Sequence, residues 1–114
     1  MPYQFRERGE FVEVRLDGVL ESFAPFVRDL IDRTGTKQVL LNLEGVTSVA
    51  ADTYALASQV QAAVTEGYRL AFFAPRPALF GISRQTLLLG NVEEGTAAGV
   101  FRDIEEARRW LLSA

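Results

Sequence analysis

The chain has 114 residues, of which 48% are apolar and 24% are charged, and its formal net charge is −3. This length allows one domain over residues 1–114 with a hydrophobic core and is too short for two domains, and the composition is that of a globular chain. The negative net charge argues against nucleic acid as the main partner, because phosphate binding needs a basic face.

Extended structure is expected at the start of the chain. Residues 11–16 alternate apolar and polar side chains, which is the period of a half-exposed strand. Residues 3–5 can add a short edge strand through a hairpin turn at Gly9-Glu10. Asp17-Gly18 is typical of a turn, after which Val19-Leu20 can resume extended structure.

A helix is expected to follow Ser22, which is a favourable N-cap residue. Pro25 suits the first turn, where its missing N–H is not needed, and Gly35 is typical of a C-terminal cap. The expected buried stripe has helical spacing. It consists of Phe23, Phe26, Val27, Leu30 and Ile31.

Residues 38–43 form a mostly apolar run, which predicts a central parallel strand covered on both faces. A short polar turn then leads into a helix over about residues 51–66, which Gly67 ends. Residues 69–73 predict another buried strand. The wide apolar stripe of the helix consists of Tyr54, Ala55, Leu56, Ala57, Val60, Ala63 and Val64.

After Pro75 and Pro77, apolar residues indicate a helix that runs to Gly90, followed by a polar loop over residues 91–98 and a short strand over 99–101. The last helix begins with a capping box, in which Asp103 accepts from the third N–H and Glu106 reaches back. Its buried stripe is Ile104, Ala107, Trp110 and Leu111. This alternation predicts a single α/β domain with a four- or five-stranded mixed sheet and about four helices.

The junction between the strand at 38–43 and the next helix is the feature most relevant to function. A strand that enters a helix through a short turn leaves the N–H groups of the helix N-terminus facing solvent. Asp52 there is either a fixed anionic determinant for a partner or only a helix cap. Thr53 is either a phosphoacceptor or an ordinary first-turn residue, and Ser48 is the other hydroxyl of the turn.

The order of elements, together with four short motifs, resembles the STAS domain, named for sulfate transporters and anti-sigma factor antagonists. The motifs are VRLDGVL at 14–20, LNLEGVT at 41–47, EGYRL at 66–70 and VFRDIEEA at 100–107. The resemblance extends over residues 11–112. It implies a STAS-like fold and a non-enzymatic regulatory binding function.

In that family the turn usually reads Asp-Ser-Ser-Gly, and a partner kinase that doubles as an anti-sigma factor phosphorylates the second Ser. Laid on this chain, the four positions are Ala50, Ala51, Asp52 and Thr53. A carboxylate is not a substrate for a Ser/Thr kinase, and it imitates phosphoserine only in part because a phosphate carries nearly two charges. The regular switch is therefore absent, and Thr53 is the remaining possible phosphosite.

The resemblance also implies where a protein partner, an anti-sigma factor or a kinase-like protein, would bind. The expected contact surface is the rim of the turn and the start of the helix. It consists of Gly18, Ser22, Ser48, Ala50, Ala51, Asp52, Thr53 and Tyr54.

The chain is also similar to bacterial SpoIIAA-like domains related to the lipid-binding Sec14 domain, in which the phosphoacceptor motif is missing. The similarity lies in Phe101-Arg102-Asp103, in Trp110-Leu111 and in the long segment over residues 75–98. This branch implies a different function, a carrier or sensor of a small apolar, lipid-like ligand held between the sheet and the helix at 75–90. The side chains expected to line that cavity are Phe72, Phe80 and Ile82, which equally fit an ordinary core.

Enzyme chemistry has little support, because the chain has no cysteine and no histidine. Thiol catalysis, thiolate metal sites and histidine bases are therefore excluded. We expect no catalytic residue, no metal and no cofactor. No run of residues approaches the roughly 20 apolar positions that span a bilayer, and residues 1–8 lack the apolar core of a signal peptide, so we expect a cytoplasmic protein.

Overall fold

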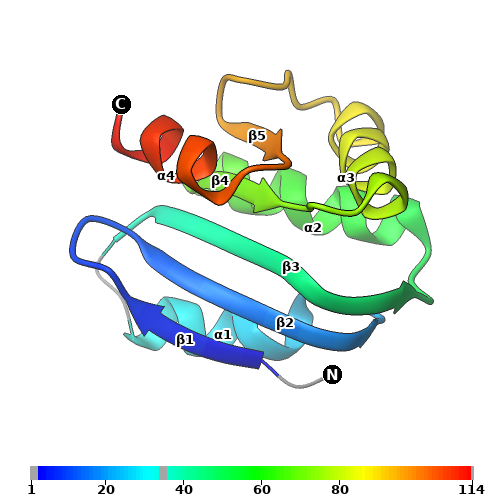
Figure 1. Cartoon of the computed structure of the whole chain (residues 1–114), viewed down its shortest axis with the longest axis horizontal. Helices are drawn as coiled ribbons and strands as arrows, with labels where there is room; N and C mark the ends of the chain where they lie inside the picture. The colour runs from blue at the N-terminus through cyan, green and yellow to red at the C-terminus, as the bar shows by residue number, and fades with distance from the viewer. Residues whose placement is uncertain (1–2, 34–35, 114) are drawn as a thin grey trace.

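Four parallel strands and one antiparallel edge strand form the sheet of the computed structural model, which describes residues 3–33 and 36–113 (Figure 1). The strands lie side by side in chain order, β1-β2-β3-β4-β5, and β1 is the antiparallel one. The predicted α/β architecture with a mixed sheet is confirmed. The strands are β1 (Tyr3–Glu7), β2 (Val12–Leu20), β3 (Gln38–Val49), β4 (Arg69–Phe73) and β5 (Ala98–Phe101).

Three helices connect the parallel strands and a fourth follows the last strand. They are α1 (Ala24–Arg33), α2 (Thr53–Thr65), α3 (Pro77–Leu89) and α4 (Ile104–Leu112). Each right-handed crossover advances by one strand in the same direction, so α1, α2 and α3 share one face of the sheet. Helix α4 alone covers the other face, and Figure 1 shows α1 and α2 behind the sheet with α4 in front.

The predicted turn at Asp17-Gly18 is wrong, because β2 continues through it to Leu20. The register between β2 and β3 shifts at this place, and Gly18 takes a φ of 82°, which only glycine adopts readily. Gly45 pairs with Asp17, and a Cβ at Gly45 would lie 1.8 Å from Asp17 Oδ1. The two glycines thus allow a locally irregular strand pair to remain closely paired.

The helices bury less of their predicted apolar stripes than expected. In α1, Val27 and Ile31 are 38% and 59% exposed, whereas Phe26 and Leu30, and Phe23 just before the helix, are buried. In α2, Tyr54 is 70% exposed. The predicted helix cap Gly35 lies outside the described residues.

The cap of α4 also differs in detail from the prediction. Asp103 Oδ1 accepts from the Glu105 N–H at 3.0 Å, one residue earlier than the capping box requires. Of the predicted buried stripe of α4, Ala107 and Leu111 are buried against β3 and β4, whereas Ile104 and Trp110 are half-buried.

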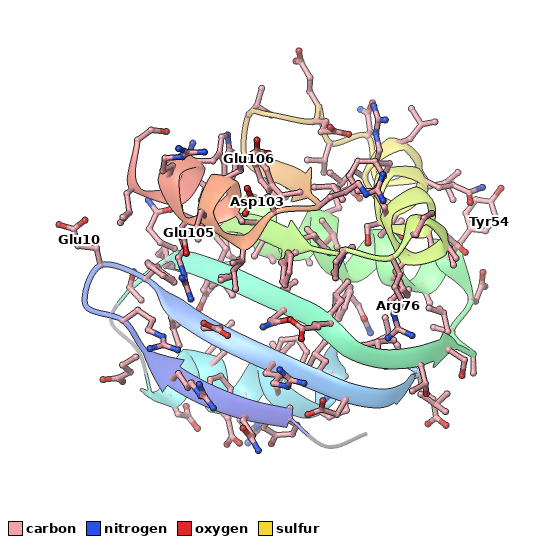
Figure 2. The ribbon with its side chains drawn as sticks, viewed as in Figure 1. Glu10, Tyr54, Arg76, Asp103, Glu105 and Glu106 are labelled. Atoms are coloured by element: carbon pink, nitrogen blue, oxygen red, sulfur yellow. The ribbon has the colours of Figure 1, made fainter. Side chains whose placement is uncertain are left out.

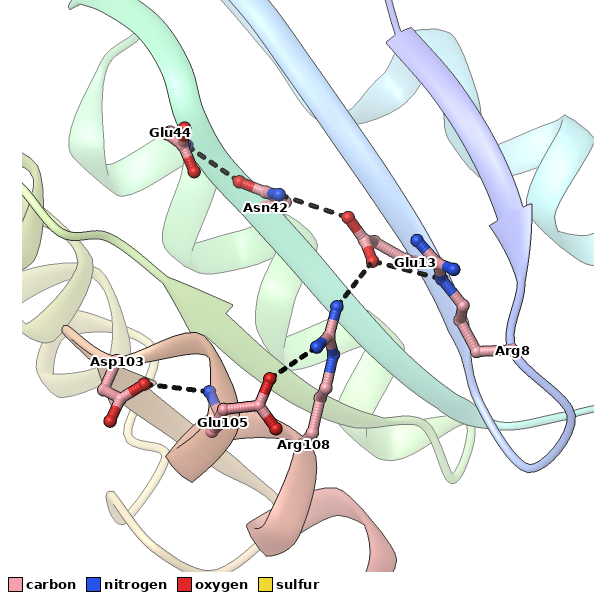
Figure 3. A network of polar contacts seen from close by, with 7 residues as sticks. All are labelled: Arg8, Glu13, Asn42, Glu44, Asp103, Glu105 and Arg108. Carbon is pink, nitrogen blue, oxygen red and sulfur yellow. Dashed lines mark hydrogen bonds and ion pairs between the residues drawn. The ribbon is translucent and has the colours of Figure 1, made fainter.

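A polar network joins α4 to strands β2 and β3 and to the β1–β2 connection (Figure 3). The buried Glu13 accepts from Asn42 Nδ2 at 3.1 Å through Oε2. Its Oε1 lies 3.5 Å from Arg8 Nε and 3.8 Å from Arg108 Nη2. Arg108 Nη1 also pairs with Glu105 Oε1 at 2.7 Å, so two arginines and two glutamates compensate one another. We therefore assign the network a structural role in tying α4 and the β1–β2 connection to β2.

Arg69 fixes the C-terminal end of α4. Its guanidinium carbon lies 3.8 Å from the centre of the Trp110 ring, which also packs against Phe101. Its Nη1 donates to the carbonyls of Trp110 and Leu111 at 2.7 and 3.0 Å. One side chain therefore satisfies helix-end carbonyls and covers an aromatic ring.

We predict that Arg69→Ala lowers the free energy of unfolding by about 1–2 kcal/mol, because it removes the cation–π contact and both charge-assisted hydrogen bonds. Urea denaturation monitored by the fluorescence of Trp110, the single tryptophan of the chain, measures the change. Arg109→Ala, on the exposed side of the same helix, is the matched control and should change stability by less than about 0.5 kcal/mol. Equal losses in the two variants would contradict the assignment.

Candidate functional site

Strands β2 and β3 extend beyond the rest of the sheet at their carboxyl ends. β3 pairs with β4 only over residues 38–42, whereas it pairs with β2 as far as Leu20 and Val49. The chain leaves this extension at residue 50 and enters α2 directly (Figure 1). The start of α2 is therefore positioned by a two-stranded extension and not by the centre of the sheet.

Side chains occupy the edge of β3 that β4 leaves unpaired. Arg76 Nη2 donates to the Glu44 carbonyl at 3.0 Å and also to the Val46 carbonyl, and Figure 2 shows this side chain beside β3. The Glu44 N–H donates to Asn42 Oδ1 at 3.0 Å. A free strand edge otherwise offers its backbone to other chains, so these contacts both satisfy the edge and hold the extension in place.

Arg76→Ala should loosen this extension without unfolding the domain. We predict that the amides of residues 46–49 exchange hydrogen about tenfold faster or more, which corresponds to losing roughly 1.5 kcal/mol of local stability. Hydrogen exchange measured by NMR resolves these amides. Arg84→Ala, another exposed arginine of α3 that pairs with Glu94, is the control and should leave them unchanged. Unaltered exchange in Arg76→Ala would show that the arginine does not hold the strand.

The turn between β3 and α2 is short and anchored to β2. The N–H groups of Ala50 and Ala51 both donate to the Leu20 carbonyl, at 2.9 and 3.2 Å. Asp52 is the N-cap of α2, and its Oδ1 accepts from the Tyr54 N–H at 3.1 Å. Asp52 is exposed, and the Tyr54 side chain projects away from the body of the protein (Figure 2).

The remaining residues of the predicted contact surface lie at the same end of the sheet. Gly18 pairs with Val46 and Val19 pairs with Ser48, so the two strands bring these positions next to the turn. Ser48 and Ala50 are exposed, whereas Gly18, Ser22, Ala51 and Thr53 are half-buried. We call this surface the β3–α2 corner; it consists of Gly18, Val19, Ser22, Ser48 and residues 50–54.

Gln59 and Val19 belong to this arrangement although sequence analysis did not select them. Gln59 accepts from the Phe23 N–H and donates to Ser22 Oγ, both at 2.8 Å, and so joins α2 to the start of α1. The sequence signal that could have identified Gln59 is its position as a polar residue within the apolar stripe of α2. Val19 is 41% exposed and adds an apolar side chain beside Ser48.

Two substitutions separate the capping role of Asp52 from its charge. We predict that Asp52→Ala lowers the free energy of unfolding by about 1 kcal/mol, because the Tyr54 N–H loses its acceptor. Asp52→Asn keeps an acceptor oxygen and should change stability by only a few tenths of a kcal/mol. Chemical denaturation measures both, and equal losses in the two variants would contradict the capping role.

The residues predicted to line a ligand cavity lie in two different settings. Phe72 is 1% exposed, and its ring lies 6.2 Å from that of Phe23 inside the main core. Phe80 and Ile82 are half-buried on α3. An apolar groove of about 660 Å³ lies between α1 and α2, and none of these three residues lines it.

The described residues contain neither a candidate metal-binding cluster nor a candidate membrane-spanning helix. Over residues 3–33 and 36–113, no group of three or more acidic side chains is placed to hold a metal ion. Within the same ranges, no helix has the length and apolar character needed to cross a membrane. Glu93 and Glu94 are both exposed, and Glu94 pairs with Arg84 at 2.8 Å.

No family model matches this sequence, and a search of curated proteins finds no match. Several solved structures share its fold, including the following two. The anti-sigma factor antagonist SpoIIAA in its unphosphorylated form superposes with a TM-score of 0.62 at 16% identity, over 99% of this chain and 100% of that one. The chain has a STAS-like fold. An uncharacterised protein with a SpoIIAA-like fold from Shewanella loihica PV-4 gives a TM-score of 0.62 at 13% identity, over 96% of this chain and 92% of that one.

Proposed function

We propose that this STAS-like domain is a non-enzymatic regulatory module of the cytoplasm that binds a protein partner through the β3–α2 corner. The observation that carries the proposal is the exposure of Tyr54, whose side chain is 70% exposed on the first turn of α2. Tyrosine gives a large contact area at a low cost in side-chain entropy and is enriched at the centres of protein interfaces. A partner surface that covers the corner would bury this ring.

The backbone and charge at the corner suit recognition of a specific partner. Asp52 contributes a negative charge beside the N-terminus of α2, and Glu21, also exposed, follows Leu20 at the end of β2. Complementary charge on a partner mainly sets the rate and the specificity of association. We therefore propose a partner with a basic group opposite Asp52, in the manner in which an anti-sigma factor antagonist meets its regulator.

The proposed interaction differs from a phosphorylation switch because residue 52 is an aspartate and not a serine that a kinase can phosphorylate. Asp52 carries its charge without a kinase, so the corner is held in one charge state. Thr53, half-buried at the first helical position, is the nearest hydroxyl, and its phosphorylation would bring a second acidic group next to Asp52. We propose a constitutive interaction, with Thr53 as the position to monitor for modification.

Site-specific photocrosslinking in the host cell tests the proposal. A benzophenone amino acid replaces Tyr54 in one variant and Leu88 in the control; Leu88 is 77% exposed on α3, outside the corner. We predict one dominant crosslinked protein from position 54 that is absent from position 88. Adding Asp52→Lys should reduce that crosslink at least fivefold, and clearly more than Asp52→Ala, which loses the same cap without adding a positive charge, because like charges then face each other.

The same experiment can overturn the proposal. Identical crosslink patterns from positions 54 and 88, or no crosslinked protein from position 54, would contradict a docking role for the corner. Mass spectrometry of the recovered protein reports modification of Thr53 at the same time. A protein phosphorylated at Thr53 in most of its copies would replace the constitutive interaction with a regulated one.

A further inference from the structure

An apolar groove of about 660 Å³ lies between α1 and α2, on the face of the sheet opposite α4. Helix α2 packs along α3 but stands away from α1. Val39, Leu41 and Leu70 of the sheet form the floor of the groove. The side chains of the two helices that form its walls include Val27, Ile31, Ala62 and Ala63.

Two apolar side chains on the wall of this groove are exposed, although the amphipathic pattern of α1 predicts that they are buried. Val27 and Ile31 are 38% and 59% exposed, yet their spacing continues the stripe that Phe23, Phe26 and Leu30 bury. A helix with such a stripe normally presents all of it to an apolar surface. Here the described part of the chain covers only half of the stripe, and the other half faces the groove.

The polar groups around the groove favour an occupant with an apolar body. Gln59, which lines the groove, already uses both ends of its amide, with Phe23 and Ser22 as partners. Tyr68, also in the lining, has Lys37 Nζ 4.4 Å from its ring centre. Apart from Tyr68 and the charged residues Arg28, Asp32 and Glu66, the lining consists of apolar side chains and an amide that is already bonded.

Size distinguishes a small molecule from a protein surface as the occupant. Grooves of about 300–1,000 Å³ are typical for small ligands. A stable protein interface requires roughly 800 Å² from each partner, whereas Val27 and Ile31 are the only large apolar side chains of the described lining that stand clearly exposed. We propose that the groove binds the unbranched alkyl or acyl chain of a single-chain amphiphile, whose head group stays in solvent.

The charged residues around the groove lead us to expect that it binds amphiphiles with anionic and cationic head groups about equally well. Arg28, Asp32 and Glu66 line it, so charges of both signs are present. Because exposed charges contribute little and these oppose one another, affinity should depend on chain length and not on head-group sign. Each methylene group buried should strengthen binding about fourfold.

NMR titration of the ¹⁵N-labelled protein tests this inference, with sodium decanoate, sodium octanoate and decyltrimethylammonium bromide as probes below their micelle concentrations. We expect saturable shifts of the amides around Val27, Ile31, Ala62 and Ala63. The alkyl chain of decyltrimethylammonium is one carbon longer than that of decanoate, so the cationic probe should bind about fourfold more tightly from chain length alone, with little further effect of its charge. Octanoate, two methylenes shorter than decanoate, should bind about 16-fold more weakly than decanoate.

Matched variants locate the binding. Ile31→Ser on the groove wall should weaken decanoate binding at least fivefold, whereas Leu88→Ser removes an even more exposed leucine of α3 and should leave it unchanged. Ala63→Phe should fill the groove and abolish binding. Ile31 is largely exposed, so Ile31→Ser keeps the test decisive if Ala63→Phe does not fold.

Several results would overturn the inference. Shifts that do not saturate, shifts centred on α3, or equal binding by Ile31→Ser and the unmodified protein would show that no alkyl-chain site exists here. A concentration-dependent dimer that Ile31→Ser abolishes would assign the groove to a second copy of the chain, and a crosslink from position 31 to another protein would assign it to a partner helix. None of these results bears on Tyr54, so the function proposed for the β3–α2 corner is tested separately.

Discussion

The parallel pairing of β2 with β3 beyond the end of β4 is the interaction on which the rest of this account depends. It carries the chain out of the five-stranded region and delivers it to α2 at Asp52. Gly18 and Gly45 allow the strands to remain paired through the change of register. Arg76 replaces the missing neighbour strand by donating to the carbonyls of Glu44 and Val46. The exposed start of α2 follows from this extension, and the proposed partner surface follows from that exposure.

Much of the fold could be predicted from the sequence because its signals are local. The strand at 69–73 and the start of the last helix after Asp103 coincide with the structure. The Asp17-Gly18 turn was wrong because the same backbone freedom serves a turn or an irregular strand, and only pairing with β3 decides between them. Val27 and Ile31 show the corresponding limit for helices, because periodicity defines an apolar stripe but not what covers it. The contacts of Gln59 and Arg76 span long stretches of sequence, so no local pattern predicts their partners, although the polar Gln59 within the apolar stripe of α2 marks the residue itself.

The β3–α2 corner and the groove share one structural link. Gln59 lies in the lining of the groove, and its amide binds Ser22 and the Phe23 N–H at the start of α1. Ser22 also belongs to the corner. A movement of α1 away from α2 would therefore have to break or follow these hydrogen bonds. Asp52 has a similar double character, since one carboxylate both caps α2 and provides the charge proposed to face a partner.

Fluorine NMR of protein labelled with 3-fluorotyrosine tests the central claim most directly, because the three tyrosines of the chain lie in three different places. Tyr54 is at the corner, Tyr3 is on the edge strand and Tyr68 lines the groove. When the delipidated protein fraction of a host-cell extract is added, so that no amphiphile reaches the groove beside Tyr68, we predict that the Tyr54 resonance shifts or broadens while those of Tyr3 and Tyr68 do not. A Tyr54 resonance that stays sharp and unshifted while either of the other two changes would contradict the assignment of the partner surface.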